Sequence, residues 1–213
     1  MLHCLILTTQ CNSLNQNTIF PFGINARWNC PAHVNIPDAY LKNWLLDTGS
    51  LTERLQSHCR EFQVVVLGQR QAALTLEEKL QLEISKADYD EADWQVREVI
   101  LLGEKRPWVF ARSIIPQSLC QSDFANLGNK PLGQLIFNDK RFSRSPFQVT
   151  HMAQPEPLLA QLGFASAEQL WGRRSVFCFQ EIKMMVAEVF LPGAPAYKNI
   201  AHLIGAAGTD HGE

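Results

Sequence analysis

Residues 94–115 read WQVREVILLGEKRPWVFARSII, two largely apolar stretches joined by the four residues from Gly103 to Arg106. Two extended stretches with so short a polar connection are typical of an antiparallel β-hairpin. We therefore expect paired strands over residues 94–102 and 107–115. Each strand carries an arginine, Arg97 in the first and Arg112 in the second, at a position where a core residue would be expected.

The flanking sequence extends this hairpin into a mixed α and β pattern. Asp38 precedes apolar residues at helical spacing, and a second short helix is expected from Leu51 after Gly49-Ser50. A further helical piece is expected within residues 76–84. Strands are expected near residues 62–69, 145–153, 171–180 and 183–191. Hairpin strands with helices collected between them favour an antiparallel α+β fold over a parallel βαβ design.

Composition and charge limit the class of protein. A chain of 213 residues with 46% hydrophobic content can bury a sizeable core, and we interpret it as one domain. The net charge of −2 and the interspersed charges argue against a nucleic-acid binder, which needs a basic face. No apolar run is long enough for a membrane span, and the apolar start of the chain is too short for a signal peptide. We expect a cytoplasmic protein and a monomer.

Cysteine and glycine patterns indicate no cofactor. The six cysteines form no C-x-x-C pair and have no metal-ligand spacing with the six histidines, so buried free thiols are the simpler interpretation. The chain also lacks G-x-G-x-x-G and G-x-x-x-x-G-K-[ST], which would indicate a dinucleotide or a nucleoside triphosphate. We therefore predict a protein that works without a metal, nucleotide or other cofactor.

Glu188 is the most informative charge, because it lies within the otherwise apolar run of residues 187–192. Burying an unpaired carboxylate is costly, so it requires an arginine partner or a ligand. Alternation along each strand places Glu188 and Arg112 on faces shared with apolar residues. For the adjacent pair Arg97 and Glu98, alternation does not show which of the two side chains faces the interior. Two guanidinium groups and a carboxylate in one apolar pocket would suit a small anionic ligand.

Residue types alone leave a structural alternative open. The same charges could form a buried Arg–Glu pair with no ligand, or they could reach solvent from edge strands. Two other features favour ordinary roles. Arg173 and Arg174, at the start of an expected strand, are more typical of a solvated end than of an anion site. His151 is more typical of a surface or core histidine than of a catalyst.

The order of several short motifs resembles the chorismate pyruvate-lyase family. Singly these motifs are weak, but their order and spacing hold from about Pro37 to Tyr197, which covers most of the chain. The matching blocks are residues 43–46, 97–102, 107–108, 111–116, 127–128, 131–133, 170–175 and 188–192, followed by Pro195 and Tyr197.

The resemblance implies a fold and a set of site residues. It implies a single antiparallel sheet with helices packed on one side and flaps that enclose an internal ligand site. Arg97 would bind the ring carboxylate of chorismate, with backbone groups at Leu132 and Leu51 assisting, and Glu188 would contact the ring hydroxyl. Arg112 would hold the enolpyruvyl carboxylate or guard the entrance. Position 51 departs from the family, which has Met there, but a backbone contact would tolerate Leu.

The resemblance also implies domain limits and an activity. Residues 27–197 would form the lyase-like domain, with 1–26 as a loosely structured extension and 198–213 as a tail. The protein would be a carbon–oxygen lyase that eliminates pyruvate from chorismate to give 4-hydroxybenzoate, the first step of ubiquinone biosynthesis. The alternative is a small-acid sensor that binds without turnover, since ligand domains of some transcription regulators resemble this fold. Such a regulator would normally carry a DNA-reading module, and residues 1–60 show no basic helix-turn-helix.

Overall fold

The computed structural model describes residues 20–122, 124, 130, 132–152, 159–160, 162 and 169–197. Its helices are η1 (Pro31–His33), α2 (Ala39–Leu46), α3 (Leu51–Gln56), α4 (Leu76–Gln81), η2 (Glu91–Asp93), α5 (Gln117–Gln121) and α6 (Leu132–Asn138). Its strands are β1 (Phe62–Gln71), β2 (Trp94–Gly103), β3 (Arg106–Pro116), β4 (Phe142–Arg144), β5 (Gln148–Met152), β6 (Leu170–Phe179) and β7 (Ile182–Phe190). The expected tail at 198–213 and residues 1–19 of the expected extension lie outside the described residues.

The β2–β3 hairpin forms as the sequence predicts. Its turn residues Glu104 and Lys105 take positive φ angles of 52° and 62°, the combination that matches the right-handed twist of paired strands. Gly103 is required beside this turn, because a Cβ there would lie 2.0 Å from a ring carbon of Trp108. The packing of the indole against bare backbone therefore favours glycine at the end of β2.

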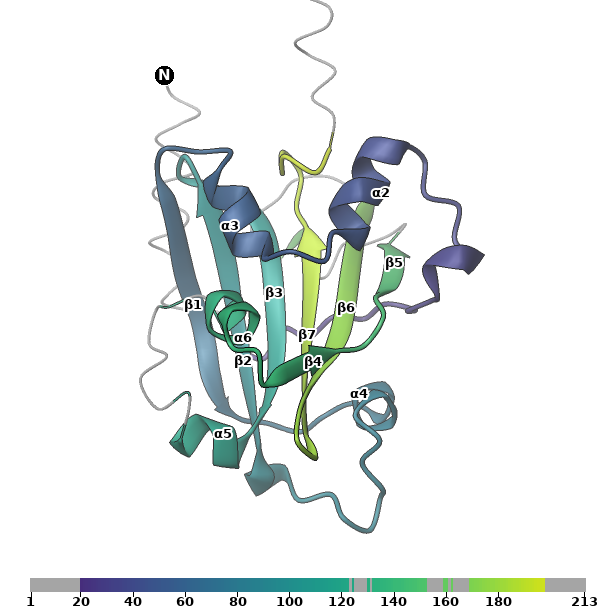
Figure 1. Cartoon of the computed structure of the whole chain (residues 1–213), viewed down its shortest axis with the longest axis vertical. Helices are drawn as coiled ribbons and strands as arrows, with labels where there is room; N and C mark the ends of the chain where they lie inside the picture. The colour runs from purple at the N-terminus through teal and green to yellow at the C-terminus, as the bar shows by residue number, and fades with distance from the viewer. Residues whose placement is uncertain are drawn as a thin grey trace, which may run out of the picture.

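All strand pairs are antiparallel and form one sheet in the order β1-β2-β3-β7-β6-β4, with β5 also paired to β6. Figure 1 shows this single twisted sheet, with the hairpins β2–β3 and β6–β7 meeting at its centre. The predicted α+β class with one antiparallel sheet is confirmed. Strand β4 was not expected, because three residues are too few to show a periodic pattern.

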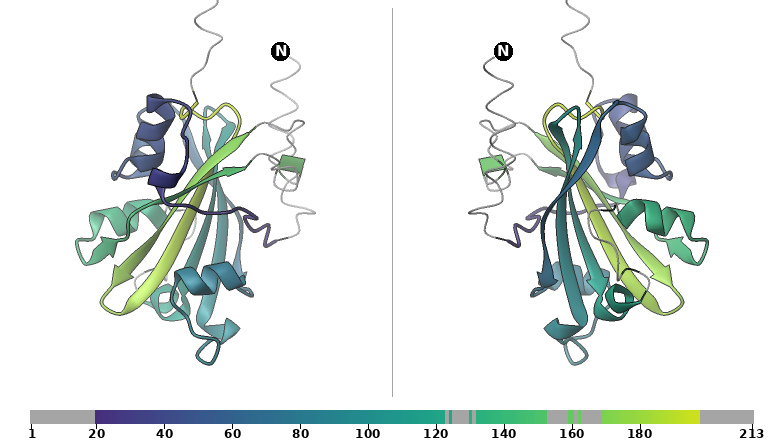
Figure 2. Two further views of the ribbon diagram at one scale, coloured as in Figure 1. Left: turned by 90° about the vertical axis from the view of Figure 1, so that its right-hand side faces the viewer. Right: turned by 90° about the vertical axis from the view of Figure 1, so that its left-hand side faces the viewer.

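Helices α2, α3 and α6 lie over one face of the sheet (Figure 2). Asp38 caps α2 by accepting hydrogen bonds from the backbone N–H groups of Tyr40 and Leu41, as its position predicts. The buried side chains of α2 and α3 pack on this face against residues of β2, β3, β6 and β7. This cluster includes Leu41, Trp44, Leu45, Leu51, Leu55, Val99, Leu101, Trp171 and Phe190.

The opposite face is covered by α4 and by residues 20–26. The backbone N–H groups of Phe22 and Gly23 donate to the Glu98 carboxylate at 2.7 and 2.9 Å. The Phe22 ring packs edge-on against Phe110, with ring centroids 6.1 Å apart. The expectation that the extension reaches residue 26 is therefore wrong for residues 20–26, because a buried carboxylate and an apolar cluster hold them on the sheet.

Among the helices of the described residues, none is both long enough and apolar enough to cross a lipid bilayer.

Candidate active site

A cavity lies on the sheet face that α3 and α6 cover. It holds about 590 Å³ of empty space, part of which is open to solvent. Its lining comes from the strands β1, β2, β3, β7 and β6, from α3 and α6, and from the segment around β4. The lining residues are Thr52, Val64, Arg97, Val99, Leu101, Ala111, Ser113, Leu132, Gly133, Ile136, Arg144, Phe147, Arg173, Ser175, Phe177, Val186 and Glu188.

Arg97 reaches this cavity from the middle of β2 and is only 3% exposed. Its guanidinium donates to Gln69 Oε1 at 2.8 Å and to the backbone carbonyl of Lys130 at 3.2 Å. Burial lowers the pKa of Arg97, but a guanidinium remains protonated in proteins. Burial also raises the pKa of the nearby Cys120 thiol to about 11, so Cys120 stays neutral at pH 7 and does not cancel the charge of Arg97.

Glu188 enters the same cavity from β7. It lies opposite Ala111 of β3 on one side and Arg173 of β6 on the other, and directly paired residues share a sheet face. Its Oε2 accepts a hydrogen bond from Arg173 Nε at 2.7 Å. This ion pair holds the carboxylate in place, and the Glu188 side chain keeps 17% exposure.

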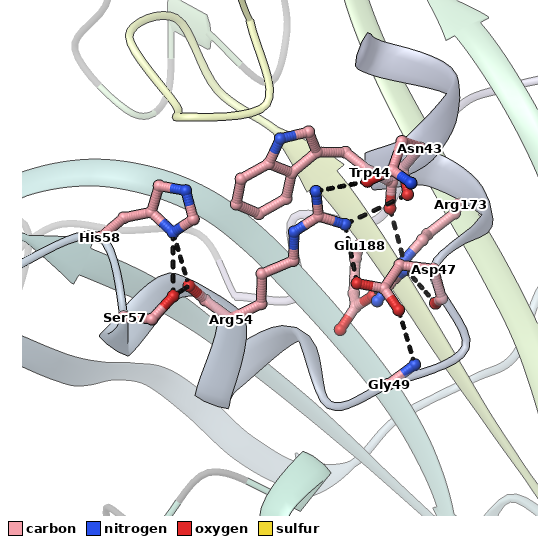
Figure 3. A network of polar contacts seen from close by, with 9 residues as sticks. All are labelled: Asn43, Trp44, Asp47, Gly49, Arg54, Ser57, His58, Arg173 and Glu188. Atoms are coloured by element: carbon pink, nitrogen blue, oxygen red, sulfur yellow. Dashed lines mark hydrogen bonds and ion pairs between the residues drawn. The ribbon is translucent and has the colours of Figure 1, made fainter. Parts of the chain in front are cut away.

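Arg173 joins Glu188 to the end of α2. Its Nη1 donates to the backbone carbonyls of Trp44 and Asp47, at 3.0 and 2.8 Å (Figure 3). Carbonyl groups at a helix C-terminus lack partners within the helix, so they suit a buried cation. The expectation that Arg173 and Arg174 form a solvated strand end is wrong, because they are only 1% and 4% exposed.

The alternation test that singled out Glu188 could have found Arg173 as well. Arg173 lies two residues from Trp171 and two from Ser175, both buried, so it occupies the inward face of β6. Arg174 points to the other face, where its Nη2 donates to Glu77 of α4 at 3.0 Å.

A second polar network supports the segment that follows α2. The Arg54 guanidinium donates to Asp47 Oδ2 and to Asn43 Oδ1, both at 2.7 Å, and lies 3.7 Å from the Trp44 ring centroid (Figure 3). Burial works to raise the pKa of Asp47, but hydrogen bonds from Gly49 N–H and Arg54 hold it below its usual value. Asp47 is therefore an anion that ties the α2–α3 connection together.

Arg112 does not reach the cavity, contrary to the sequence prediction. It lies opposite Glu98 of β2 and Ala187 of β7, which places it on the other sheet face from Glu188. Its guanidinium donates to Glu98 Oε1 at 2.7 Å and to Glu78 Oε1 of α4 at 2.8 Å. Alternation within a strand shows which residues share a face of that strand. It does not show which face of one strand lies on the same side of the sheet as a given face of another strand.

The two positions expected to contribute backbone groups lie close to the cavity. Leu132 is the first residue of α6 and lines the cavity. Leu51 is the first residue of α3, and its side chain is buried in the core cluster under α2 while the next residue, Thr52, lines the cavity. His151 is exposed, bonds Gln169 and stacks on Trp171, outside the cavity.

Sheet geometry separates the two principal charges along the cavity lining. In the sheet, Arg97 of β2 lies beside Ser113 of β3, and Glu188 of β7 lies beside Ala111 of β3. Arg97 and Glu188 are therefore two strands apart across the sheet and two residues apart along the strands. Their Cα atoms are therefore roughly 12 Å apart. Both residues line the cavity, and this separation is of the order that one small ring with a carboxylate at one end and a hydroxyl group at the other would need. Within the described residues, no group of histidine, cysteine and carboxylate side chains could hold a metal ion.

Comparison with known proteins identifies the family. Residues 23–201 match the family described as chorismate lyase. A probable chorismate pyruvate-lyase from Pseudoalteromonas atlantica is 53% identical over 180 residues, which cover 84% of this chain and 93% of that protein. Another from a Shewanella species is 41% identical over 183 residues, covering 82% of this chain and 92% of that protein.

A solved structure, the effector domain of PhnF from Mycobacterium smegmatis, shares the fold with a TM-score of 0.51 at 11% identity. The match covers 68% of this chain and 89% of that one. Likeness at so low an identity concerns the fold alone. The family match, by contrast, extends over the whole sheet and every residue that lines the cavity. The chain therefore belongs to the chorismate lyase family and is a carbon–oxygen lyase.

Proposed function

We propose that this protein is a chorismate pyruvate-lyase that forms 4-hydroxybenzoate and pyruvate, the first step of ubiquinone biosynthesis. The observation that carries the proposal is that Arg97 and Glu188 line one buried cavity from the same face of the sheet. Chorismate has a ring carboxylate and a ring hydroxyl at para positions. A cation and a hydrogen-bond acceptor at opposite ends of a cavity match that arrangement.

In the proposed complex, Arg97 binds the ring carboxylate through a charge-assisted hydrogen bond, since a guanidinium matches the geometry of a carboxylate. The start of α6 at Leu132 and the start of α3 at Leu51 contribute backbone N–H groups at the same end. Glu188 accepts a hydrogen bond from the ring hydroxyl. The rigid sheet then holds the ring while the apolar lining, including Val99 and Phe177, excludes water.

The reaction breaks the C–O bond between the ring and the enolpyruvyl group and removes the hydrogen on the hydroxyl-bearing carbon. The electron pair of that C–H bond completes the aromatic ring, and the leaving group takes up a proton to become pyruvate. Gain of aromaticity drives the elimination, so the chemistry requires no redox partner. The proton acceptor is either Glu188 or the ether-derived leaving group itself, and the two routes predict different results for a Glu188→Gln variant.

The direct test is incubation of the purified protein with chorismate and no additive, beside a sample without protein. We expect 4-hydroxybenzoate and pyruvate in equal amounts at a rate that follows protein concentration. Tight binding of 4-hydroxybenzoate without any turnover would instead favour a small-acid sensor and would contradict the proposal. The proposal also includes a cytoplasmic monomer that acts without a cofactor, and activity after exhaustive treatment with a chelator is the expected result.

A further inference from the structure

Chorismate carries a second carboxylate, on the enolpyruvyl group, which needs a cation of its own in a desolvated site. The enolpyruvyl ether is attached to the ring carbon next to the hydroxyl-bearing carbon. If Glu188 contacts the hydroxyl, as the proposed function holds, this second carboxylate lies at the Glu188 end of the cavity. Arg112 cannot serve it, because Arg112 lies on the opposite sheet face.

Three arginines line the cavity among the described residues: Arg97, Arg144 and Arg173. Arg97 belongs to the other end of the cavity, where the ring carboxylate would lie. Arg173 is already engaged, since its Nε donates to Glu188 and its Nη1 to two backbone carbonyls. Arg144 also lines the cavity, so its guanidinium has access to a ligand there.

The surroundings of Arg144 place it at the Glu188 end. Arg144 is the last residue of β4, and its guanidinium carbon lies 4.2 Å from the ring centroid of Phe147. The guanidinium carbon of Arg173 lies 4.7 Å from the same ring, so the two arginines converge on Phe147. Burial and repulsion by Arg173 lower the pKa of Arg144, while attraction to Glu188 and Asp47 opposes this change.

We propose that Arg144 binds the enolpyruvyl carboxylate and thereby distinguishes chorismate from 4-hydroxybenzoate. The product has only the ring carboxylate and the hydroxyl, so Arg97 and Glu188 hold it without Arg144. Pyruvate carries the second carboxylate away with it. A cation beside the leaving group also stabilises the negative charge that develops on the ether oxygen as the C–O bond breaks.

This inference rests on the proposed function and is tested by separating substrate binding from product binding. We expect Arg144→Gln to lower kcat/KM for chorismate by about 10- to 100-fold, the effect of losing one charge-assisted hydrogen bond. The inhibition constant for 4-hydroxybenzoate should change less than about threefold, since no predicted product contact is lost. Arg144→Lys should recover part of the loss. The matched control is Arg141→Gln, which removes an exposed arginine three residues away that pairs with Asp139.

A second measurement needs no turnover. Two inhibitors of similar size, 3-carboxymethoxy-4-hydroxybenzoate and 3-ethoxy-4-hydroxybenzoate, differ only in the second carboxylate. The unaltered protein should bind the first at least about 10-fold more tightly, and Arg144→Gln should remove that preference. Equal affinity of the unaltered protein for the two compounds, or an unchanged preference in Arg144→Gln, would overturn the assignment. Absence of chorismate turnover by the unaltered protein would contradict the proposed function instead.

Discussion

At the scale of single residues, the site depends on one guanidinium and one carboxylate held by different means. Arg97 is fixed by an amide oxygen and a backbone carbonyl, which are neutral, so its full charge remains available to an anion. Glu188 is fixed by another charge, Arg173. Neutral groups therefore hold the cation of the site in place, whereas a cation holds its acid in place.

The first prediction concerns Arg97. We expect Arg97→Ala to lower kcat/KM for chorismate at least about 100-fold, because the ring carboxylate would be buried without a cation. The control is Arg106→Ala, which removes an exposed arginine from the start of β3 and should leave the rate within about twofold. Steady-state kinetics on both variants, with circular dichroism to check folding, measure the effect. Near-normal activity of Arg97→Ala would remove Arg97 from the site.

The second prediction concerns Glu188. Glutamine keeps an oxygen that can accept a hydrogen bond, but it cannot take up a proton under these conditions. If Glu188 is the proton acceptor, Glu188→Gln should lower kcat about 100-fold or more while 4-hydroxybenzoate still binds. Stopped-flow turnover and product titration measure the two quantities. A full rate in Glu188→Gln would exclude proton transfer to Glu188 and leave it only a hydrogen-bonding role; Glu53→Gln, on the exposed side of α3, is the control.

At the scale of elements, the α2–α3 pair is held over the sheet by charges at its connection. Arg173 of β6 binds the carbonyl end of α2, and Arg54 of α3 binds Asp47 and Asn43. These contacts link both helices to the strand that positions Glu188. Arg173 therefore fixes both the position of the α2–α3 connection and the orientation of the Glu188 carboxylate.

The third prediction uses the lowered pKa of Asp47. A carboxylate whose pKa is lower in the folded than in the unfolded protein stabilises the fold above about pH 4, and this stabilisation is lost as pH falls through the folded value. Asp47→Asn should thus be less stable than the unaltered protein at pH 6, and the difference should shrink below about pH 4. Urea unfolding at both pH values measures this.

The control for this pH effect is Glu61→Gln. Glu61 pairs with Lys105 at 3.7 Å with both side chains exposed, so its removal should change stability little at either pH. A stability difference for Asp47→Asn that stays constant from pH 6 to pH 3 would show that Asp47 acts through shape rather than charge.

At the scale of the whole molecule, the two faces of the sheet have different roles. One face holds the cavity under α3 and α6, and the other holds an ionic cluster in which Arg112 joins Glu98 to Glu78 of α4. Glu98 in turn holds the backbone of residues 22–23. Burial works to lower the pKa of Arg112, but hydrogen bonds to Glu78 and Glu98 and their attraction raise it, so Arg112 keeps its positive charge.

The fourth prediction separates these roles. Arg112→Met should destabilise the fold by about 3–5 kcal/mol, because two buried carboxylates lose their partner. Its KM for chorismate, measured well below the unfolding temperature, should remain near that of the unaltered protein. Adding Glu98→Gln and Glu78→Gln should recover part of the stability, since no buried charge is then left unpaired. A raised KM in a folded Arg112→Met variant would bring Arg112 back into the site.

Much of this protein follows from local sequence. The β2–β3 hairpin follows from two apolar runs around a short polar turn, and α2 follows from the capping residue Asp38 and its helical spacing. Glu188 stands out because a charge within an apolar strand is costly and must be compensated, whereas the same argument does not separate Arg97 from Glu98. These features depend on near neighbours in the chain, which a single sequence displays directly.

Which charges meet is decided only by the tertiary structure. Arg112 and Glu188 both lie among apolar residues of their strands, yet the register of β3 against β7 places them on opposite faces. The register of β6 against β7 brings Arg173 to Glu188, although the sequence around Arg173 suggested a solvated end. Period-two alternation defines two faces for each strand, but a shift of one residue between strands exchanges them. That shift is determined by long-range pairing and packing, which no local pattern contains.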